Sequence, residues 1–560
     1  MQIGIAGSGP AADSFRAALD DIDATATDAA PDALGSHPLG VVVAPAGAPA
    51  FEAADAAATR WIAVEIGGLG GVTVSDLDAA VTVFADGIGY RDLRERVASG
   101  NLEASDDDPT GGRSAVRLAG AVAGHRAVSL LGGADLAGTV VEVPGDERRV
   151  YAVPRPDGRA RDLRRTSRDV SLDDAVGRAE RAVDDRVGLL TQVGERESFP
   201  APYYLAVTAD TTVYSDARAA TYTAGVGDDW DHAFVKALGE GLERYCAGVY
   251  RQSAFDVAPP AQSDGVSPAA FVSPDGAVDP GTPIPWVPGE DLVTGDAVSL
   301  PAEFVHYPPS AERHRPAITT GLGLGNAGVE ALLSGLYEVI ERDAAMLAWY
   351  STYDPLGLTV TEAGFEALVA RARAEQLTVT PTLLTADVDV PVVAVAVHRE
   401  DDWPHFAVGS GANLDAAAAA RSALAEALQN WMELRAMGPE KAAEEEGAIG
   451  HYADFPPAAR ELVDADEGVP AANVGPDDVP EGAAELDAVV DRAADAGLSV
   501  YGARITTPDV ADLGFEAVRV LSPEAQPLFV GEPYFGERAA TVPGELGYEP
   551  RLDRPFHPYP

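Results

Sequence analysis

One stretch, residues 326–350, constrains the fold most, because it predicts a helix with one apolar face and one acidic face. At about 100° per residue, the apolar side gathers Leu332, Leu333, Leu336, Val339 and Ile340. The other side gathers Asn326, Glu330, Glu338 and Glu341. Charged residues on a helix usually face solvent. Here the glycines of residues 321–325 and the apolar run 344–349 predict that both helix ends are buried, and a buried acidic face needs cations.

The pattern Glu-x-x-Glu-Arg of this helix occurs a second time, at residues 240–244. Glutamates three positions apart on a helix point the same way. Two such pairs on facing helices predict a site for a divalent cation with oxygen ligands, the chemistry that suits Mg²⁺ on nucleotide phosphates. The paired carboxylates are Glu240, Glu243, Glu338 and Glu341. A third helix, residues 415–437, follows Gly409-Ser410-Gly411 and adds Glu426.

The net charge of −49, from 89 acidic and 40 basic residues, excludes some classes of partner. The acidic residues are spread along the whole length, whereas an acidic partner-binding surface would concentrate them in blocks. With Lys236 and Lys441 as its only lysines, the chain has a composition typical of a halophile's high-salt cytoplasm, where charge repulsion keeps proteins soluble. No basic stripe is present to neutralise nucleic-acid phosphates. The single cysteine, Cys246, excludes an intramolecular disulfide and a Cys₄ zinc site.

The length of 560 residues predicts two or more domains. Residues 1–15 predict a strand, a glycine turn (Gly7-x-Gly9-x-x-Ala12) and a helix start, which is a weak dinucleotide-fold signature. Strand-like runs at 40–44 and 61–66 extend this α/β domain, and an unpatterned basic stretch places the junction near Arg168. The chain opens without the features of a signal peptide, and no apolar run reaches about 18 residues. We therefore expect a cytoplasmic protein without a membrane span.

Three stretches, in this order along the chain, resemble the YcaO family of ATP-dependent enzymes that modify peptide backbones. They are AGVGDDWDHAFVKALGEGLERY (224–245), TTGLGLGNAGVEALLSGLYEVIERD (319–343) and GSGANLDAAAAARSALAEALQNW (409–431). The resemblance implies an α/β fold in which a YcaO-type mixed α/β domain occupies residues 169–560, with an acidic surface insertion at 438–487. Residues 1–168 resemble, more faintly, the ThiF-like, Rossmann-like domains fused ahead of such domains.

The resemblance also implies a set of ligands for Mg²⁺ and ATP. Mg²⁺ would be held by Glu240, Glu243, Glu338 and Glu341, and ATP by Asn326, Glu330, Arg342 and Glu426. Arg421 lies one position out of register with an arginine of the family. Val226 stands where many relatives have a lysine, and we hypothesise that Lys236 replaces that lysine on phosphate. The alternative is an ordinary ion pair between Lys236 and Glu240, four positions further on.

Residues 554–560, RPFHPYP, resemble the proline-rich terminus of azoline-forming YcaO enzymes. The resemblance implies that His557, Pro558 and Pro560 orient catalytic groups, because proline fixes an extended backbone. A disordered terminus is the alternative.

The N-terminal domain departs from the ThiF-like pattern. Segments 87–101 and 148–158 resemble places where relatives carry zinc-binding cysteine pairs, yet neither contains a cysteine. A thiolate zinc site is therefore impossible. We interpret the domain as a degenerate one that docks a peptide, or that braces the rest of the molecule.

By resemblance, the expected function is ATP- and Mg²⁺-dependent modification of a backbone amide in a ribosomally made peptide, as in bacteriocin-like biosynthesis. The expected reaction is cyclodehydration of Cys, Ser or Thr to an azoline. Thioamidation with a sulfur-donor partner and noncatalytic binding of a leader peptide are the alternatives. Expected partners are the substrate peptide, a leader-peptide-binding or sulfur-donor protein, and a second copy of the chain in a homodimer.

Overall fold

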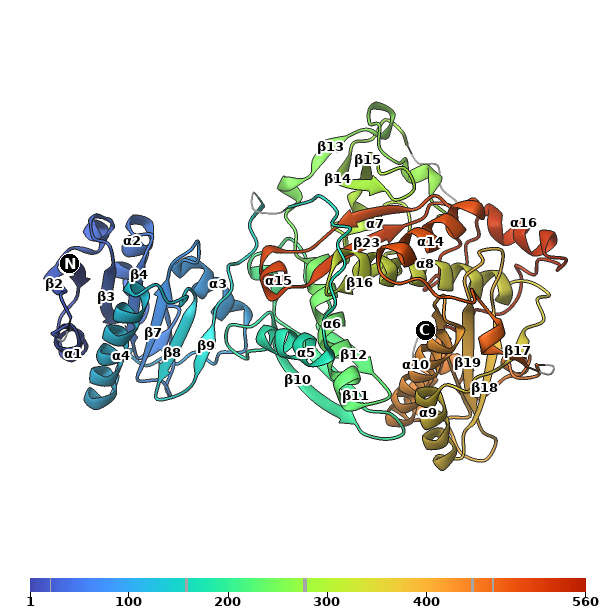
Figure 1. The fold of residues 1–560 in the computed structure, drawn as a ribbon, viewed down its shortest axis with the longest axis horizontal. Coiled ribbons are helices and arrows are strands. Elements are labelled where there is room, and N and C mark those ends of the chain that lie inside the picture. Colours follow the sequence, from blue (N-terminus) through green and yellow to red (C-terminus); the bar gives the residue numbers. More distant parts are fainter. Residues whose placement is uncertain (21, 157–159, 275–278, 445–447, 466–467) are drawn as a thin grey trace. The chain divides into compact units, whose positions relative to one another are not determined.

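The computed structural model describes residues 1–560 except 21, 157–159, 275–278, 445–447 and 466–467 (Figure 1). It divides into two compact units. The N-terminal unit comprises Met1–Arg155, Arg181–Gln192 and Val207–Ser215, and the C-terminal unit comprises Pro156–Glu180, Val193–Ala206 and Asp216–Pro560. The division is therefore interleaved, whereas the sequence suggested one junction near Arg168.

The N-terminal unit is built on a seven-stranded sheet in the order β2-β1-β3-β4-β7-β8-β9. The strands are β1 (Gln2–Ala6), β2 (Thr25–Asp28), β3 (Gly40–Pro45), β4 (Trp61–Ile66), β7 (Ala79–Phe84), β8 (Thr139–Val143) and β9 (Glu147–Arg149). The first four in sheet order pair in parallel and the rest antiparallel. Parallel strands joined by helices are the Rossmann-like arrangement that the opening glycine turn predicts.

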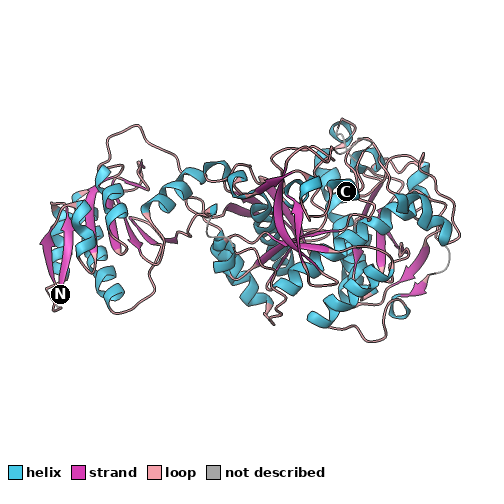
Figure 2. Ribbon diagram, turned by 90° about the horizontal axis from the view of Figure 1, so that it is seen from above, coloured by secondary structure: helices cyan, strands magenta, loops and turns pink. Residues whose placement is uncertain are grey.

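Helices cover both faces of this sheet (Figure 2). Helices α1 (Pro10–Ala18) and α4 (Arg113–Leu131) pack with Ile3, Val41 and Val81 on one face. Helices α2 (Pro49–Ala57) and α3 (Tyr90–Ser99) pack with Val42 and Phe84 on the other. The alternation of side chains along each strand thus supplies two separate cores. A small hairpin of β5 (Gly68–Leu69) and β6 (Val72–Thr73) follows β4.

The C-terminal unit contains two larger sheets. The first has the order β13-β14-β22-β23-β16, with β15 beside β14: β13 (Asp256–Ala258), β14 (Ile284–Asp291), β15 (Ala297–Pro301), β16 (Leu322–Gly325), β22 (Tyr501–Arg504) and β23 (Glu516–Leu521). The second has the order β20-β19-β18-β17-β21: β17 (Leu356–Thr359), β18 (Thr378–Leu383), β19 (Val392–His398), β20 (Phe406–Ala412) and β21 (Val469–Pro470). A third sheet, β10-β11-β12, consists of β10 (Leu190–Glu197), β11 (Tyr203–Thr208) and β12 (Tyr222–Val226).

Three long helices, each directly after a strand, position the predicted site. Helix α6 (Trp230–Gly248) follows β12, α8 (Gly328–Trp349) follows β16, and α10 (Ala416–Met437) follows β20. Helix α8 packs on β16 and β23 of the first sheet and on β19 and β20 of the second, while α10 packs on β19 and β20. Glycine allows these close contacts, since a Cβ on Gly323 would lie 2.2 Å from the carbonyl oxygen of Ala331, and one on Gly409 would lie 2.4 Å from that of Ala423. Each sequence motif is therefore one strand-and-helix unit.

Shorter helices complete the C-terminal unit. They are α5 (Leu172–Ala179), α7 (Ala302–Val305), α9 (Ala363–Ala374), α11 (Pro439–Ala442), α12 (Ala448–Tyr452), α13 (Pro457–Arg460), α14 (Ala483–Asp495), α15 (Pro508–Leu513) and α16 (Glu537–Glu545). In the part of the chain that the structure describes, none of the helices combines the length and the apolar composition of a membrane span.

Residues 438–487 are more than the acidic surface insertion that their composition suggested. Tyr452 and Phe455 are buried in the core that also contains α8, and β21 adds a strand beside β17. The sequence did not predict that this segment contributes to the core, because its apolar residues are widely spaced among many acidic ones. Residues 445–447 and 466–467 of this segment lie outside the described residues.

Candidate active site

The α6 glutamates lie on one side of a helix whose other side is packed. Ala233, Ala237 and Leu242 of α6 are buried. Glu240 accepts hydrogen bonds from the backbone N of Ala224 (2.8 Å) and from Arg244 (3.2 Å). Glu243 accepts one from Arg244 at 2.7 Å. Burial raises the pKa of Glu243 to about 7; Arg244 opposes this rise, and the nearby Glu338 and Glu240 add to it.

The α8 glutamates join this cluster from the neighbouring helix. Glu338 accepts a hydrogen bond from the backbone N of Gly321 at 3.0 Å, and Glu341 accepts one from the Ser410 hydroxyl at 2.6 Å. Burial also raises the pKa of Glu341 to about 7; Arg342 opposes the rise, and Glu426 and Glu338 add to it. Because Glu338 acts on both Glu243 and Glu341, the two predicted pairs form one electrostatic cluster.

Helix α10 contributes through Glu426. One oxygen of Glu426 accepts a hydrogen bond from the backbone N of Ser410 at 2.7 Å, and the other lies 3.4 Å from Nη2 of Arg342. Ser410 therefore contacts carboxylates from both α8 and α10. Arg421, one turn before Glu426, forms an ion pair of 3.4 Å with Glu362.

Asn326 and Glu330 lie at the start of α8 and contact each other. The backbone N and Nδ2 of Asn326 donate to Glu330 at 2.9 and 3.2 Å. The side-chain oxygen of Asn326 accepts a hydrogen bond from Arg178 at 2.6 Å. Hydrogen bonds of Asn326 therefore connect α5 to the start of α8.

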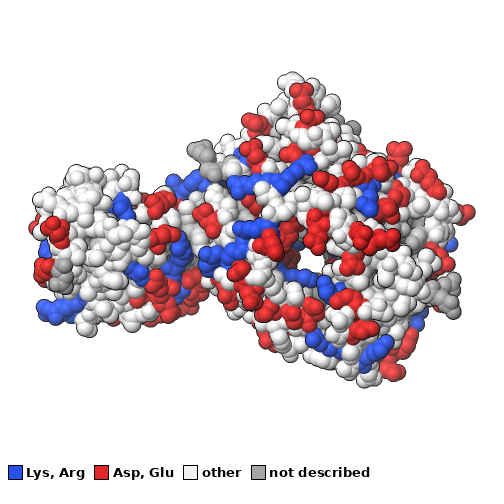
Figure 3. Space-filling view, in the orientation of Figure 1, with Lys and Arg blue, Asp and Glu red and all other residues white. Residues whose placement is uncertain are grey.

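A cavity of about 470 Å³ opens beside these residues. Its volume lies in the range of roughly 300–1,000 Å³ typical of small-molecule sites. One part of its wall is apolar and is formed by Val170, Leu172, Ala175, Ala179 and Phe515. The other part is polar and includes Lys236, Glu240, Glu243, Asn326, Glu330 and Ser334. In the space-filling view, acidic and basic side chains lie next to each other around a hollow of the C-terminal unit (Figure 3).

Lys236 does not form the ion pair with Glu240 that the i,i+4 spacing allowed. Among the described residues, Lys236 has no ion pair within 4.0 Å, and Glu240 is paired with Arg244 instead. The side chain of Lys236 is exposed at the cavity wall. Even so, the surrounding protein displaces enough bulk water to lower the pKa of Lys236.

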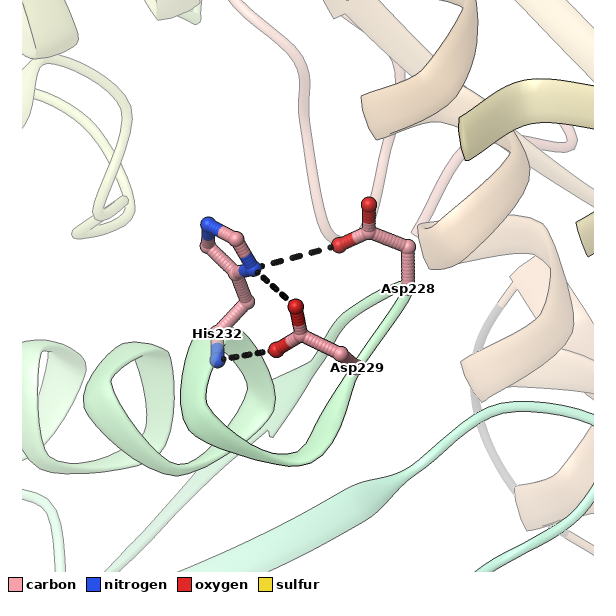
Figure 4. Close-up of side chains that lie close together, drawn as sticks. All are labelled: Asp228, Asp229 and His232. Atoms are coloured by element: carbon pink, nitrogen blue, oxygen red, sulfur yellow. Dashed lines mark hydrogen bonds and ion pairs between the residues drawn. The ribbon is translucent and has the colours of Figure 1, made fainter. Parts of the chain in front are cut away.

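A second group of ligand-type atoms lies at the N-terminus of α6 (Figure 4). The Nδ1 atom of His232 is 2.9 Å from Asp229 and 3.4 Å from Asp228. However, Asp229 is the N-cap of α6, and its other oxygen accepts the backbone N–H of His232 at 2.9 Å. Capping of the helix accounts for this arrangement.

Sequence reasoning missed Arg519, a buried arginine of β23 that is 2% exposed. It donates to the carbonyl oxygens of Thr319 and Ile318, but its Nε has no hydrogen-bond partner among the residues that the structure describes. Burial lowers the pKa of Arg519 to about 9; Arg315 and Arg244 lower it further, whereas Glu338 and Glu243 oppose the change. The single arginine within the otherwise apolar residues 517–521 was the available signal.

The proline-rich tail is docked, in contrast to the alternative of a disordered terminus. The indole of Trp349 donates to the carbonyl oxygen of Pro555 at 2.8 Å, and Pro558 is buried. An oxygen of Pro560 accepts a hydrogen bond from Arg342 at 3.2 Å, so the tail reaches the acidic cluster.

His557 is bound to backbone rather than to a site carboxylate. Its Nε2 lies 2.9 Å from the carbonyl oxygen of Phe529, and the residue is 1% exposed. Burial lowers the pKa of His557 to about 4, so the imidazole is neutral at physiological pH. Its Nε2 therefore carries the hydrogen and donates a hydrogen bond to the carbonyl oxygen of Phe529.

The described residues fit a magnesium–nucleotide ligand. The carboxylate of Glu341 is buried and that of Glu243 is largely so, and other carboxylates crowd both; a divalent cation would relieve this repulsion. The unpartnered Nε of Arg519 is a donor suited to an anion. A cavity with one apolar and one polar wall lies beside this cluster.

Fold and site together define a mixed α/β protein in which three strand-and-helix units bring carboxylates into one cluster. The chain belongs to the YcaO family: the sequence profile described as YcaO cyclodehydratase, ATP- and Mg²⁺-binding, matches residues 224–526. The fold class and the family predicted from the three motifs are thus confirmed.

Two curated relatives are similar over part of their length. An uncharacterized protein of Methanothermobacter thermautotrophicus is 31% identical over 218 residues, which cover 37% of this chain and 56% of the relative. An uncharacterized protein in the tfuA 3′ region of Rhizobium leguminosarum bv. trifolii is 30% identical over 167 residues, 26% of this chain and 39% of the relative. The chain thus matches about half or less of each relative.

Two solved structures share the fold over 98% of this chain. A heterocyclase in complex with substrate and cofactor is 18% identical, with a TM-score of 0.72 and 83% of its chain covered. The heterocyclase TruD is 16% identical, with a TM-score of 0.65 and 81% of its chain covered. At this identity the likeness supports the fold of both units, while a ThiF-like origin of the N-terminal unit stays a prediction.

Proposed function

We propose that this protein is an ATP- and Mg²⁺-dependent enzyme that converts Cys, Ser or Thr of a ribosomally made peptide to an azoline. The observation that carries the proposal is the cluster of Glu243, Glu338 and Glu341, in which Glu338 raises the pKa of both other carboxyl groups. Arg342 lies beside Glu341 and also donates a hydrogen bond to an oxygen of Pro560. The family profile, described as ATP- and Mg²⁺-binding, supports the same reading.

Each polar residue of the cluster has a role in this proposal. Glu240, Glu243, Glu338 and Glu341 would hold Mg²⁺ through carboxylate oxygens. Asn326, Glu330 and Glu426 would position the nucleotide, and Arg342 and Arg519 would bind its phosphates. When bound, Mg²⁺ neutralises phosphate charge and ATP turns the amide oxygen into a good leaving group.

The proposed reaction removes one molecule of water from the peptide. The side-chain sulfur or oxygen bonds to the carbon of the preceding carbonyl, and the bond from that carbon to its oxygen breaks. The oxygen departs with the terminal phosphoryl group of ATP as inorganic phosphate, leaving ADP. The side-chain proton and the amide proton are released, and a C=N bond completes the ring. The protein contributes positioning and charge stabilisation.

The tail residues have a positioning role in this proposal. His557 anchors the tail through the Phe529 carbonyl, and Pro558 and Pro560 lead the chain to Arg342. The docked tail favours ring formation among the reactions considered. We also propose that a partner protein presents the peptide and that the enzyme is a homodimer.

Calorimetry with MgATP tests the site, comparing the native protein with Glu338→Gln/Glu341→Gln. We expect affinity to fall more than about 100-fold, because loss of even supporting partners of a metal ligand typically costs 10- to 100-fold. Unchanged affinity in the folded double variant would refute the assignment of these glutamates.

Mass spectrometry of candidate peptides incubated with the protein and MgATP then identifies the reaction. Loss of the mass of one water from a peptide containing Cys, Ser or Thr is the expected result. Exchange of oxygen for sulfur in the presence of a sulfur donor would indicate thioamidation instead. Peptide binding without any ATP turnover would favour the noncatalytic alternative.

A further inference from the structure

Within the part of the chain that the structure describes, Lys236 is a cation without an ion-pair partner, although the chain is rich in carboxylates. It lies on α6, one helical turn before Glu240 and two before Glu243, and it lines the 470 Å³ cavity. The chain has 89 acidic residues against 40 basic ones, so carboxylate partners are abundant. Nevertheless, among the residues that the structure describes, no carboxylate oxygen lies within 4.0 Å of its ammonium.

The other cations of the site are held in place by protein groups. Arg244 is paired with Glu240 and Glu243, Arg342 with Glu426, and Arg421 with Glu362. Lys236 therefore differs from these three arginines, because among the described residues it has no carboxylate partner. An ammonium offers three donors on a flexible stem, and it suits a phosphate oxygen as a point charge.

The surroundings of Lys236 also favour an anion in the cavity. Arg421 of α10 lies close enough to repel the ammonium, and Asp228 and Glu426 lie close enough to attract it. The protein around the cavity displaces water from the ammonium, which is the main influence; it disfavours the charged form and lowers the pKa of Lys236. An anionic ligand in the cavity would supply the negative charge that the described residues do not place next to the Lys236 ammonium.

Resting on the proposed function, we infer that Lys236 binds a phosphate group of the nucleotide in this cavity. The cavity then has two complementary electrostatic parts. The carboxylates hold the metal, while Lys236 contacts a phosphate oxygen directly.

Amine labelling tests the contact without requiring turnover. The chain has two lysines, and Lys441, exposed at α11, is a built-in control. The native protein would be treated with an acetylating reagent at graded times, with and without MgATP, and both lysines followed by peptide mass spectrometry. We expect MgATP to slow acetylation of Lys236 and to leave Lys441 unchanged. Equal rates at Lys236 with and without saturating MgATP would overturn the inference.

Calorimetry with Lys236→Met and the control Lys441→Met gives a second readout. We expect Lys236→Met to weaken MgATP binding by about 10- to 100-fold, the range for loss of a hydrogen bond to a charged group. Adenosine, which has no phosphate, should bind both variants equally. Equal loss for adenosine and MgATP would show that Lys236 only shapes the cavity and would overturn the inference.

The outcomes separate this inference from the proposed function. If the native protein and Lys236→Met bind MgATP equally well, Lys236 has no role in binding phosphate, and the proposed function still holds. Native, folded protein that binds no MgATP removes both. Weakened binding by Lys236→Met alone supports both.

Discussion

Glu65 of the N-terminal unit and Glu341 of the C-terminal unit are both buried carboxylates, but their surroundings differ. Burial raises the pKa of Glu65, and its hydrogen-bond donors oppose the rise. Glu65 accepts hydrogen bonds from the backbone N of Gly70 (2.8 Å), from that of Gly71 (2.9 Å) and from the Tyr90 hydroxyl (2.8 Å). Its oxygens are therefore committed to the turn that follows β4.

Glu341 has far less local compensation. It accepts one hydrogen bond from Ser410, its nearest guanidinium nitrogen is 3.5 Å away on Arg342, and Glu426 and Glu338 raise its pKa further. Burial of a carboxylate does not by itself mark a functional site. A buried carboxylate that is crowded by others beside a cavity is the informative case, because such an arrangement is costly without a ligand.

The largest expected effect is structural and concerns Glu65. Replacement Glu65→Ala leaves three donors without their acceptor, and we expect the N-terminal unit to lose about 3–5 kcal/mol. Hydrogen exchange of the β4 and β7 amides measures this loss. Glu52→Ala removes an exposed carboxylate of α2 and serves as the control, with a change within about 0.5 kcal/mol.

The same Glu65 variant should leave MgATP affinity unchanged, because Glu65 contributes nothing to the cavity of the C-terminal unit. If Glu65→Ala loses much of its MgATP affinity at a temperature where both units stay folded, Glu65 is not a purely structural carboxylate and the contrast with Glu341 is wrong.

A second, smaller effect is the pH dependence of Mg²⁺ binding. Glu243 and Glu341, whose pKa values are about 7, must lose their protons before they bind a cation. Affinity should therefore fall as pH drops below 7, by roughly tenfold per carboxylate for each further pH unit. Calorimetry from pH 8 to pH 6 in two buffers of different ionisation enthalpy also counts the protons released. An affinity that is flat over this range would contradict the assignment of these two carboxylates as ligands.

The sequence predicted the local parts of the site well. The helix expected at 326–350 is Gly328–Trp349, and that expected at 415–437 is Ala416–Met437, which Asp415 caps. Spacing along one helix is enough to place Glu338 beside Glu341. The strand-and-helix motifs themselves were thus predictable without knowledge of long-range contacts.

The sequence could not predict which groups complete the site from distant segments. Ser410 joins Glu341 to Glu426 across two helices, and Arg519 enters from a strand near the end of the chain. A serine in an apolar strand has many uses, and only the pairing of β19 with β20 and the packing of α8 fix this one. His557 was expected to serve catalysis, whereas its contact with the Phe529 carbonyl depends on a fold-wide arrangement.

The smallest expected effect concerns Glu341 in the absence of metal. Replacement Glu341→Gln keeps an oxygen that can accept the Ser410 hydroxyl and removes the repulsion from Glu338 and Glu426. The folded pKa of Glu341 is above its unfolded value, so ionisation destabilises the metal-free fold as pH rises through about 7. We therefore expect the variant to be more stable than the native protein at pH 8, by about 1 kcal/mol.

The gain should shrink toward pH 5.5, where Glu341 is already protonated in the folded protein. Urea unfolding at both pH values in EDTA measures the difference. Glu65→Gln is the matched control, because it places an amide where both oxygens accept hydrogen bonds and should lose stability at both pH values. If Glu341→Gln destabilises the protein at pH 8, the contacts of Glu341 with Ser410 and Arg342 contribute more than its repulsion by Glu338 and Glu426 costs. Glu341 would then belong with Glu65 as a structural carboxylate, and the acidic cluster would have to bind its cation without it.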